Sequence, residues 1–244
     1  MYRTISLLLI CFITVVTGKA QSDVYSAARA GLNLREAPEQ SAKVLVKVPF
    51  GEKLKALSDS LYGVAYTEGM QCNWRKVQYG GKTGYAASAY VLPIKPPSAS
   101  PEDILKYLES ILIKVGESQY EDRSSEEAGI KVEKKLFKNG LSYRIITGYE
   151  YYKETIWLPK FSMEQAYVLA RLISPVSGLL STEDAFPSVS SMPESSDARS
   201  VDVKFAFENS YPYYVKFEYC EGACFTLTID NEGGEVSISI SAGV

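Results

Sequence analysis

Histidine is the residue type that would carry most hydrolytic chemistry, and this chain of 244 residues contains none. Cysteine peptidases and L,D-transpeptidase-like enzymes need a histidine base, and zinc amidases need histidine ligands. The sequence therefore argues against these classes. It also shows no phosphate-binding glycine motif, so we expect neither a metal nor another cofactor.

Carboxylates remain as possible catalysts, because a suitably spaced pair of them cleaves glycosidic bonds. Candidates lie near the ends of expected strands, at Glu150, Glu154, Glu208, Glu218 and Asp230. No motif ties any two of them together, and single acids in strands usually form a solvated face. A histidine-independent hydrolase that uses two carboxylates in the C-terminal part is the alternative to a non-catalytic protein.

Two of the four cysteines are close enough in sequence to pair. Cys220 and Cys224 flank a Glu-Gly turn, and a hairpin there would bring their Cβ atoms to disulfide distance. A redox-active or metal-binding pair would need further ligands or a thiolate-stabilising partner, so the sequence favours a structural disulfide. Cys72 lies near Trp74 in an expected strand and is predicted to be a buried thiol.

Residues 1–20 have the features of a secretory signal peptide. A basic Arg3 precedes an apolar run over residues 5–16, and small residues lead to a cleavage site after Ala20. The run is shorter than the ~20 apolar residues of a membrane-spanning helix. We therefore expect an exported protein, periplasmic or extracellular, with no membrane span after cleavage.

Charge is distributed unevenly along the chain. Residues 21–93 contain nine Lys and Arg against six Asp and Glu, for a net charge of +3, whereas residues 94–244 contain fifteen against twenty-three, for −8. The negative total argues against a nucleic-acid partner, because binding phosphates requires a basic surface. The split indicates that the two parts meet different environments.

The chain divides into two expected domains. Residues 21–93 consist of short segments rich in β-branched and aromatic residues between Pro, Gly, Asn and Asp turns, which is typical of an all-β module. The proline-rich residues 94–100 predict a stiff, extended linker. Residues 101–244 predict an α+β domain with two helices on a mainly antiparallel sheet.

Several elements of the second domain are indicated by local signals. Ser100 before Pro101 predicts the start of a helix whose apolar face extends to Val115, and Ser162 caps a second helix that ends near Ile173. Lys138-Asn139-Gly140 predicts a hairpin turn. Residues 174–200, with nine serines and three prolines, predict an exposed loop or mobile lid.

Four segments of the first domain stand in a characteristic order. They read Leu-Asn-Leu-Arg-Glu-Ala-Pro at 32–38, Val-Pro-Phe-Gly-Glu-Lys-Leu at 48–54, Trp-Arg-Lys-Val at 74–77 and Gly-Tyr-Ala-Ala-Ser-Ala-Tyr-Val at 84–91. In this order and spacing, residues 24–93 resemble the bacterial SH3 (SH3b) domain family. The resemblance implies a small all-β SH3-like barrel, with a longer variable loop than usual at residues 58–71; residues 101–244 show no such resemblance.

The resemblance also implies binding, because SH3b relatives commonly bind cell-wall peptides or partner proteins through aromatic and polar groups. The implied partner is peptidoglycan or a cell-envelope protein. The candidate ligand-binding residues are Tyr62, Tyr66, Tyr85, Tyr90, Arg35 and Trp74. Tyr62 and Tyr66 in the expected loop suit a surface role, whereas Trp74 and Tyr85 also fit packing inside the barrel. Arg35 also fits a structural role beside the following loop.

A third possibility is purely structural. The barrel would pack tightly on the second domain and bind nothing soluble, and a large apolar interface between the two would support that interpretation.

Overall fold

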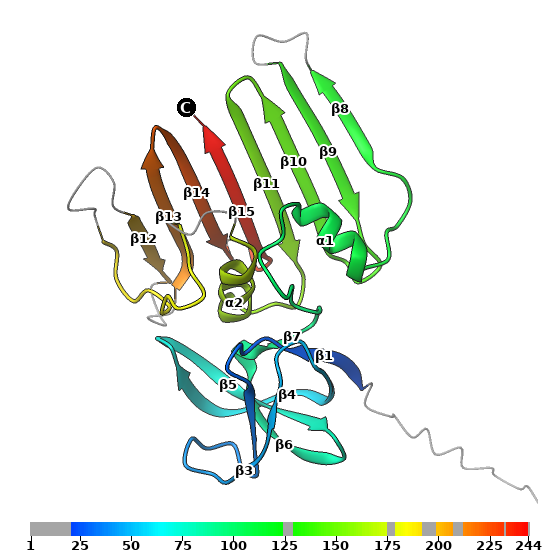
Figure 1. Cartoon of the computed structure of the whole chain (residues 1–244), viewed down its shortest axis with the longest axis vertical. Coiled ribbons are helices and arrows are strands. Elements are labelled where there is room, and N and C mark those ends of the chain that lie inside the picture. The colour runs from blue at the N-terminus through cyan, green and yellow to red at the C-terminus, as the bar shows by residue number, and fades with distance from the viewer. Residues whose placement is uncertain are drawn as a thin grey trace, which may run out of the picture.

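The computed structural model describes residues 21–123, 129–174, 179–191, 199–206, 212–231 and 233–243. Its described part is mostly β, with two α-helices and two antiparallel sheets (Figure 1). The expected signal peptide, residues 1–20, lies outside the described residues. No helix in the described ranges is long and apolar enough to cross a membrane.

The N-terminal sheet, which we call the small sheet, has seven strands in the order β3-β2-β6-β5-β4-β1-β7. The strands are β1 (Ser22–Ser26), β2 (Leu32–Arg35), β3 (Val44–Val48), β4 (Lys53–Thr67), β5 (Met70–Tyr79), β6 (Lys82–Ala87) and β7 (Val91–Leu92), with a 3-10 helix η1 (Ser88–Tyr90) before β7. Leu34, Leu54 and Val77 are fully buried. No pairing of β3 with β7 is present among the described residues, so a closed barrel stays a prediction.

The predicted long loop at residues 58–71 is instead a β-hairpin. These residues belong to β4 and β5, which pair up to a turn at Glu68-Gly69. The pairing register shifts between Ala56 and Leu61 and again after Tyr62, and such bulges accommodate extra residues while the strands continue. The sequence prediction failed because bulged strands lose the simple alternation of polar and apolar residues.

The C-terminal sheet, which we call the large sheet, has eight strands in the order β12-β13-β14-β15-β11-β10-β9-β8. The elements are α1 (Ile104–Ile111), β8 (Gln119–Arg123), β9 (Ile130–Leu136), β10 (Ser142–Gly148), β11 (Tyr151–Leu158), α2 (Met163–Ile173), β12 (Ser200–Phe205), β13 (Pro212–Glu221), β14 (Ala223–Asp230) and β15 (Val236–Gly243). Each helix precedes four sequential strands, and the last strands of the two sets, β11 and β15, pair with each other. The predicted hairpin at Asn139-Gly140 joins β9 and β10.

The two faces of the large sheet differ in polarity. One row across six strands is apolar and buried: Tyr143, Ile156, Ile238, Ile229, Val215 and Val203. A neighbouring row on the opposite face is polar across all eight strands: Gln119, Lys134, Arg144, Thr155, Ser239, Thr228, Lys216 and Asp202. Alternate residues of a strand point to opposite faces, so the sequence alternation sets an apolar inner face and a polar outer face.

Both helices lie on the inner face (Figure 1). Lys135, which points to that face, forms an ion pair of 2.7 Å with Glu109 of α1. Helix α2 begins as predicted, with a capping box in which the Ser162 hydroxyl accepts from the Gln165 backbone N–H and the Gln165 side chain accepts from the Ser162 backbone N–H.

Helix α1 is shorter than predicted. It begins at Ile104, because the carboxylate of Asp103 accepts from the Lys106 backbone N–H at 2.9 Å and caps the helix. Ser100, the predicted cap, donates its hydroxyl to the Ser174 carbonyl instead. Leu112 is already extended, so the helix ends before Val115.

Helix α2 lies between the two sheets, and all eleven of its residues are buried (Figure 1). The predicted linker does not extend freely, because Ile94, Pro96 and Pro97 are buried and Tyr107 donates to the Lys95 carbonyl at 2.6 Å. One continuous apolar core includes residues of both sheets and of α2. The small sheet is therefore packed on the large one through α2.

The predicted exposed loop at residues 174–200 is packed in part of its described length. Three of its apolar residues are buried: Leu179, Leu180 and Phe186. The Tyr167 ring of α2 contacts the Phe186 ring edge-on, with ring centroids 4.8 Å apart. The serine-rich composition of this segment predicted exposure, although three of its apolar residues are buried. Residues 175–178 and 192–198 lie outside the described ranges.

Candidate functional site

A cavity of about 250 Å³ lies at the junction between the small sheet and α2. It brings together three of the six predicted ligand-binding residues: Arg35 from β2, Trp74 from β5 and Tyr90 from η1. Its other wall contains Arg171 of α2. We call this space the junction cavity.

Two of the three predicted residues are held by the protein itself. The Trp74 side chain is buried, and its Nε1 donates to the Val64 carbonyl at 3.2 Å. Arg35 Nη1 donates to the Ala42 carbonyl at 2.7 Å, which ties β2 to the loop that follows it. Both side chains therefore shape the wall of the cavity, and Arg35 has the structural role that the sequence also allowed.

Tyr90 differs from its neighbours in hydrogen bonding. Tyr90 is only 6% exposed, and its buried hydroxyl lies beside Glu68 and Arg171 without a hydrogen bond of standard geometry to any described residue. Burial, together with the nearby Glu68 carboxylate, raises the pKa of Tyr90 to about 12. At neutral pH the hydroxyl is therefore protonated, and it is a donor that Glu68 holds only loosely.

Arg171 fixes the opposite wall. Its Nη1 donates to Glu68 Oε2 at 2.7 Å and to the carbonyls of Thr182 and Asp184 at 3.1 and 2.8 Å. Burial acts to lower the pKa of Arg171, but the ion pair with Glu68 outweighs it and leaves the pKa raised. Sequence reasoning missed this residue, although a lone arginine inside an apolar helix is a signal of a buried polar contact.

Helix α2 also holds the segment that carries Tyr90. Gln165 Nε2 donates to the carbonyls of Ser88 and Val91 at 3.2 and 2.6 Å. On the other side, the Phe186 backbone N–H donates to the Glu68 carbonyl at 2.8 Å. The second part of the chain therefore positions both edges of the junction cavity.

The three remaining candidates do not line the junction cavity. Tyr62 and Tyr85 contact each other edge-on, with ring centroids 5.2 Å apart, and Lys76 Nζ lies 5.7 Å from the Tyr85 centroid. Tyr66 is 68% exposed. These tyrosines lie in β4 and β6, so the structure separates the predicted set into a cavity group and a surface group.

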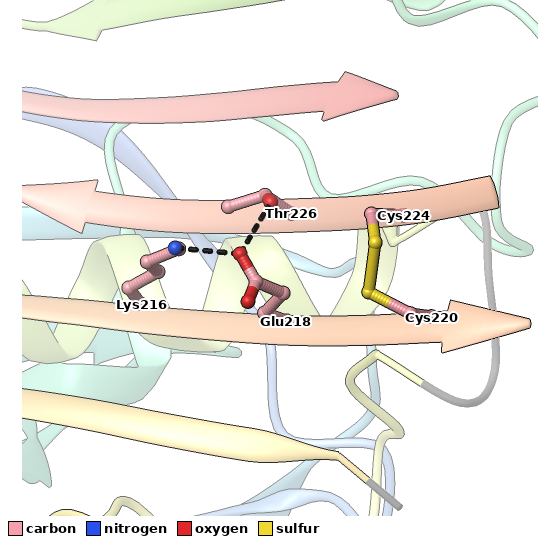
Figure 2. Close-up of a disulfide and its surroundings, with 5 residues drawn as sticks. All are labelled: Lys216, Glu218, Cys220, Cys224 and Thr226. Atoms are coloured by element: carbon pink, nitrogen blue, oxygen red, sulfur yellow. Dashed lines mark hydrogen bonds and ion pairs between the residues drawn. A yellow bond between two sulfur atoms is a disulfide. The ribbon is translucent and has the colours of Figure 1, made fainter. Parts of the chain in front are cut away.

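The two paired cysteines lie at one end of the large sheet. Cys220 on β13 and Cys224 on β14 form a disulfide with an S–S distance of 2.09 Å (Figure 2). Cys72 is a free, buried cysteine, as predicted, and burial raises the pKa of its thiol. A raised thiol pKa disfavours the nucleophilic thiolate.

The candidate carboxylates are spread over both faces of the large sheet. Glu154 points to the inner face, whereas Glu218 and Asp230 point to the outer one, where Glu218 is paired with Lys216 at 2.6 Å (Figure 2). Glu150 lies in the turn before β11, and Glu208 lies outside the described residues. No group of three or more Cys, Asp or Glu side chains in the described ranges is arranged to hold a metal ion.

The junction cavity combines aromatic and apolar lining residues with a few polar and cationic groups, which is the usual composition of a ligand-binding site. Residues 30–91 match the family model of the bacterial SH3 domain, which confirms the resemblance noted in the sequence. Domains of this family are commonly cell-wall binding modules. Searches among curated proteins and among solved structures found no match.

Proposed function

We propose that this chain is an exported, non-catalytic protein of the cell envelope whose SH3 module binds cell-wall peptide at the junction cavity. The observation that carries the proposal is the match of residues 30–91 to the bacterial SH3 domain, because the junction cavity opens between that module and α2. The expected signal peptide and the absence of histidine are consistent with a secreted binding protein.

The chemistry of the cavity suits a peptide with a carboxylate. Tyr90 offers a loosely held hydroxyl donor, and Arg29, an exposed lining residue, offers a cation at the entrance. The Glu68 carboxylate is already paired with Arg171. Residues 21–93 have a net charge of +3, which complements wall peptides because these carry carboxylates. The volume of about 250 Å³ limits the bound part to a few heavy-atom groups, such as the end of a peptide chain.

The test is co-sedimentation of the whole mature chain with purified insoluble peptidoglycan. The whole chain is used because α2 completes the cavity. We expect wild-type protein in the pellet and no soluble muropeptides in the supernatant. Tyr90→Phe, which removes only the loosely held hydroxyl, should weaken retention about fivefold, since one hydrogen bond contributes about 1 kcal/mol.

Tyr79→Phe is the matched control. The Tyr79 hydroxyl bonds to Glu52 at 3.4 Å on the surface of the same module and does not line the cavity. Its removal should leave retention unchanged. Wild-type protein that stays in the supernatant would contradict wall binding, and release of muropeptides would support the two-carboxylate hydrolase instead.

A further inference from the structure

A second, larger cavity lies on the outer face of the large sheet, away from α2. It has a volume of about 720 Å³ and is formed by β8, β9, β10 and β11 with the chain segment before β8. We call it the outer-face cavity. Its size is in the range of cavities that hold small organic ligands, roughly 300–1,000 Å³.

Arg144 lies in the wall of this cavity and is partly exposed. Its buried Nε has no hydrogen-bond partner in the described part of the chain, so no acceptor of the protein holds that edge of the guanidinium. The neighbouring residue across the strands is Lys134, which is exposed and also lines the cavity. Two adjacent lining cations, Arg144 and Lys134, create a site that favours a carboxylate, since guanidinium binds carboxylates through paired hydrogen bonds.

An aromatic ring lies beside the arginine. Arg144 Cζ lies 5.0 Å from the centroid of the Trp157 ring, and Trp157 is half-buried in the cavity wall. This contact fixes the guanidinium in place before any ligand arrives, which reduces the entropy lost on binding. The indole surface also provides flat apolar area for the body of a ligand.

The remaining polar groups restrict the ligand further. Glu117 and Glu235 line the cavity as exposed carboxylates, and Ser142 adds a hydroxyl. Carboxylates repel a ligand that is only anionic, but they accept hydrogen bonds from hydroxyl groups. A suitable ligand therefore combines one carboxylate, several hydroxyls and a ring.

We propose that the outer-face cavity binds a carboxylate-bearing saccharide. The carboxylate pairs with Arg144 and Lys134, hydroxyls donate to Glu117 and Glu235, and a sugar ring lies against Trp157. Such a saccharide has two sources, the uronic acids of acidic polysaccharides and muramic acid of the cell wall from which the stem peptide has been removed. This site is independent of the junction cavity and does not depend on wall-peptide binding.

The experiment titrates the mature full-length chain with soluble sugars and follows binding by calorimetry and by tryptophan fluorescence. The probes are a galacturonic acid disaccharide, N-acetylmuramic acid and, as the uncharged comparison, N-acetylglucosamine. We expect at least one acidic probe to bind and shift the fluorescence of Trp157, since Trp74 is buried elsewhere. Preference for the uronic acid or the muramic acid identifies the source.

Arg144→Gln is the informative variant and should weaken binding of the acidic probe about tenfold or more, because it removes the charge. Lys204→Gln is the matched control: Lys204 Nζ lies 4.4 Å from the Tyr214 centroid on the same sheet, outside the cavity, and its replacement should change nothing. Equal binding of the uncharged sugar, full affinity in Arg144→Gln, or no binding of either acidic probe would overturn the proposal. Wall-peptide binding is measured separately, so the two proposals fail independently.

Discussion

Two arginines of this protein have similar aromatic neighbours and different partners. Arg171 lies 5.3 Å from the Tyr167 ring centroid at the junction of the sheets, and Arg144 lies 5.0 Å from that of Trp157 on the outer face. Arg171 donates to Glu68 and to two carbonyls, whereas Arg144 Nε has no partner among the described residues. The ring contact therefore fixes the position of each arginine, and the hydrogen-bond acceptors around it decide whether its guanidinium joins parts of the fold or stays available to a ligand.

The largest expected effect comes from removing the arginine at the junction. Arg171→Met should lower the free energy of unfolding by about 3–4 kcal/mol, because it leaves the Glu68 carboxylate unpaired and removes two hydrogen bonds to the carbonyls of Thr182 and Asp184. Arg144→Met should change it by less than about 0.5 kcal/mol. Urea unfolding followed by circular dichroism measures the free energy of unfolding of both variants. Equal losses in the two would contradict a structural role that Arg171 has and Arg144 lacks.

Replacing the turn glycine that meets the second part of the chain should have the next largest effect. Gly69 has φ +78°, and an added Cβ would lie 2.6 Å from the Phe186 carbonyl oxygen. Gly69→Ala should cost about 2–3 kcal/mol from backbone strain and displacement of that segment. Gly81→Ala, at φ +76° with open space around it, should cost only about 1 kcal/mol. Equal losses of stability in the two variants, measured by thermal unfolding, would show that the turn of the β4–β5 hairpin makes no close contact with Phe186.

Removing the disulfide should have a moderate effect that is confined to stability. Cys220 and Cys224 are four residues apart, and closing so short a loop contributes about 2 kcal/mol in the chain-entropy model. The double replacement by serine should lower stability by about that amount and leave saccharide binding at Arg144 unchanged. A loss of binding would show that the outer-face cavity depends on the far end of the sheet.

The smallest effect is a dependence of stability on pH. Burial raises the pKa of Glu164 in α2 above its usual 4.5, so the folded protein takes up a proton that the unfolded chain has lost. The stabilisation that this proton uptake gives the folded state is fully present below pH 4.5, and it is lost as the pH rises through the pKa of Glu164 in the folded protein. Glu164→Gln should therefore be more stable than wild type at pH 7 and lack this decline. The measurement is the free energy of unfolding as a function of pH. Parallel curves for the wild type and Glu164→Gln would contradict the expected proton uptake by Glu164.

The family motifs of the small sheet were recognisable from sequence because they are local, whereas its β4–β5 hairpin at residues 58–71 was predicted as a loop. The order from Leu32 to Val91 indicated the SH3 family. Gly84 in the last of these motifs sits where an added Cβ would lie 2.4 Å from the Arg35 carbonyl oxygen. The hairpin at Asn139-Gly140 and the cap at Ser162 were local signals too, and both predictions are confirmed.

The parts that failed depend on contacts between distant segments. The buried linker at Ile94 and the packed segment around Phe186 are held by α2, which sequence patterns could not place between two sheets. The junction cavity combines Tyr90 with Arg171, and the outer-face cavity combines Arg144 with Glu235. Such pairs come together only through strand order and packing, so composition and spacing did not reveal them.

Wall-peptide recognition at the junction cavity is tested by titrating the mature chain with a soluble wall stem peptide that carries no sugar. We expect wild type and Arg144→Gln to bind this peptide equally and Tyr90→Phe to bind it about fivefold more weakly. Absence of peptide binding in the wild type, or a loss caused by Arg144→Gln in place of Tyr90→Phe, would contradict the assignment of wall-peptide recognition to the junction cavity.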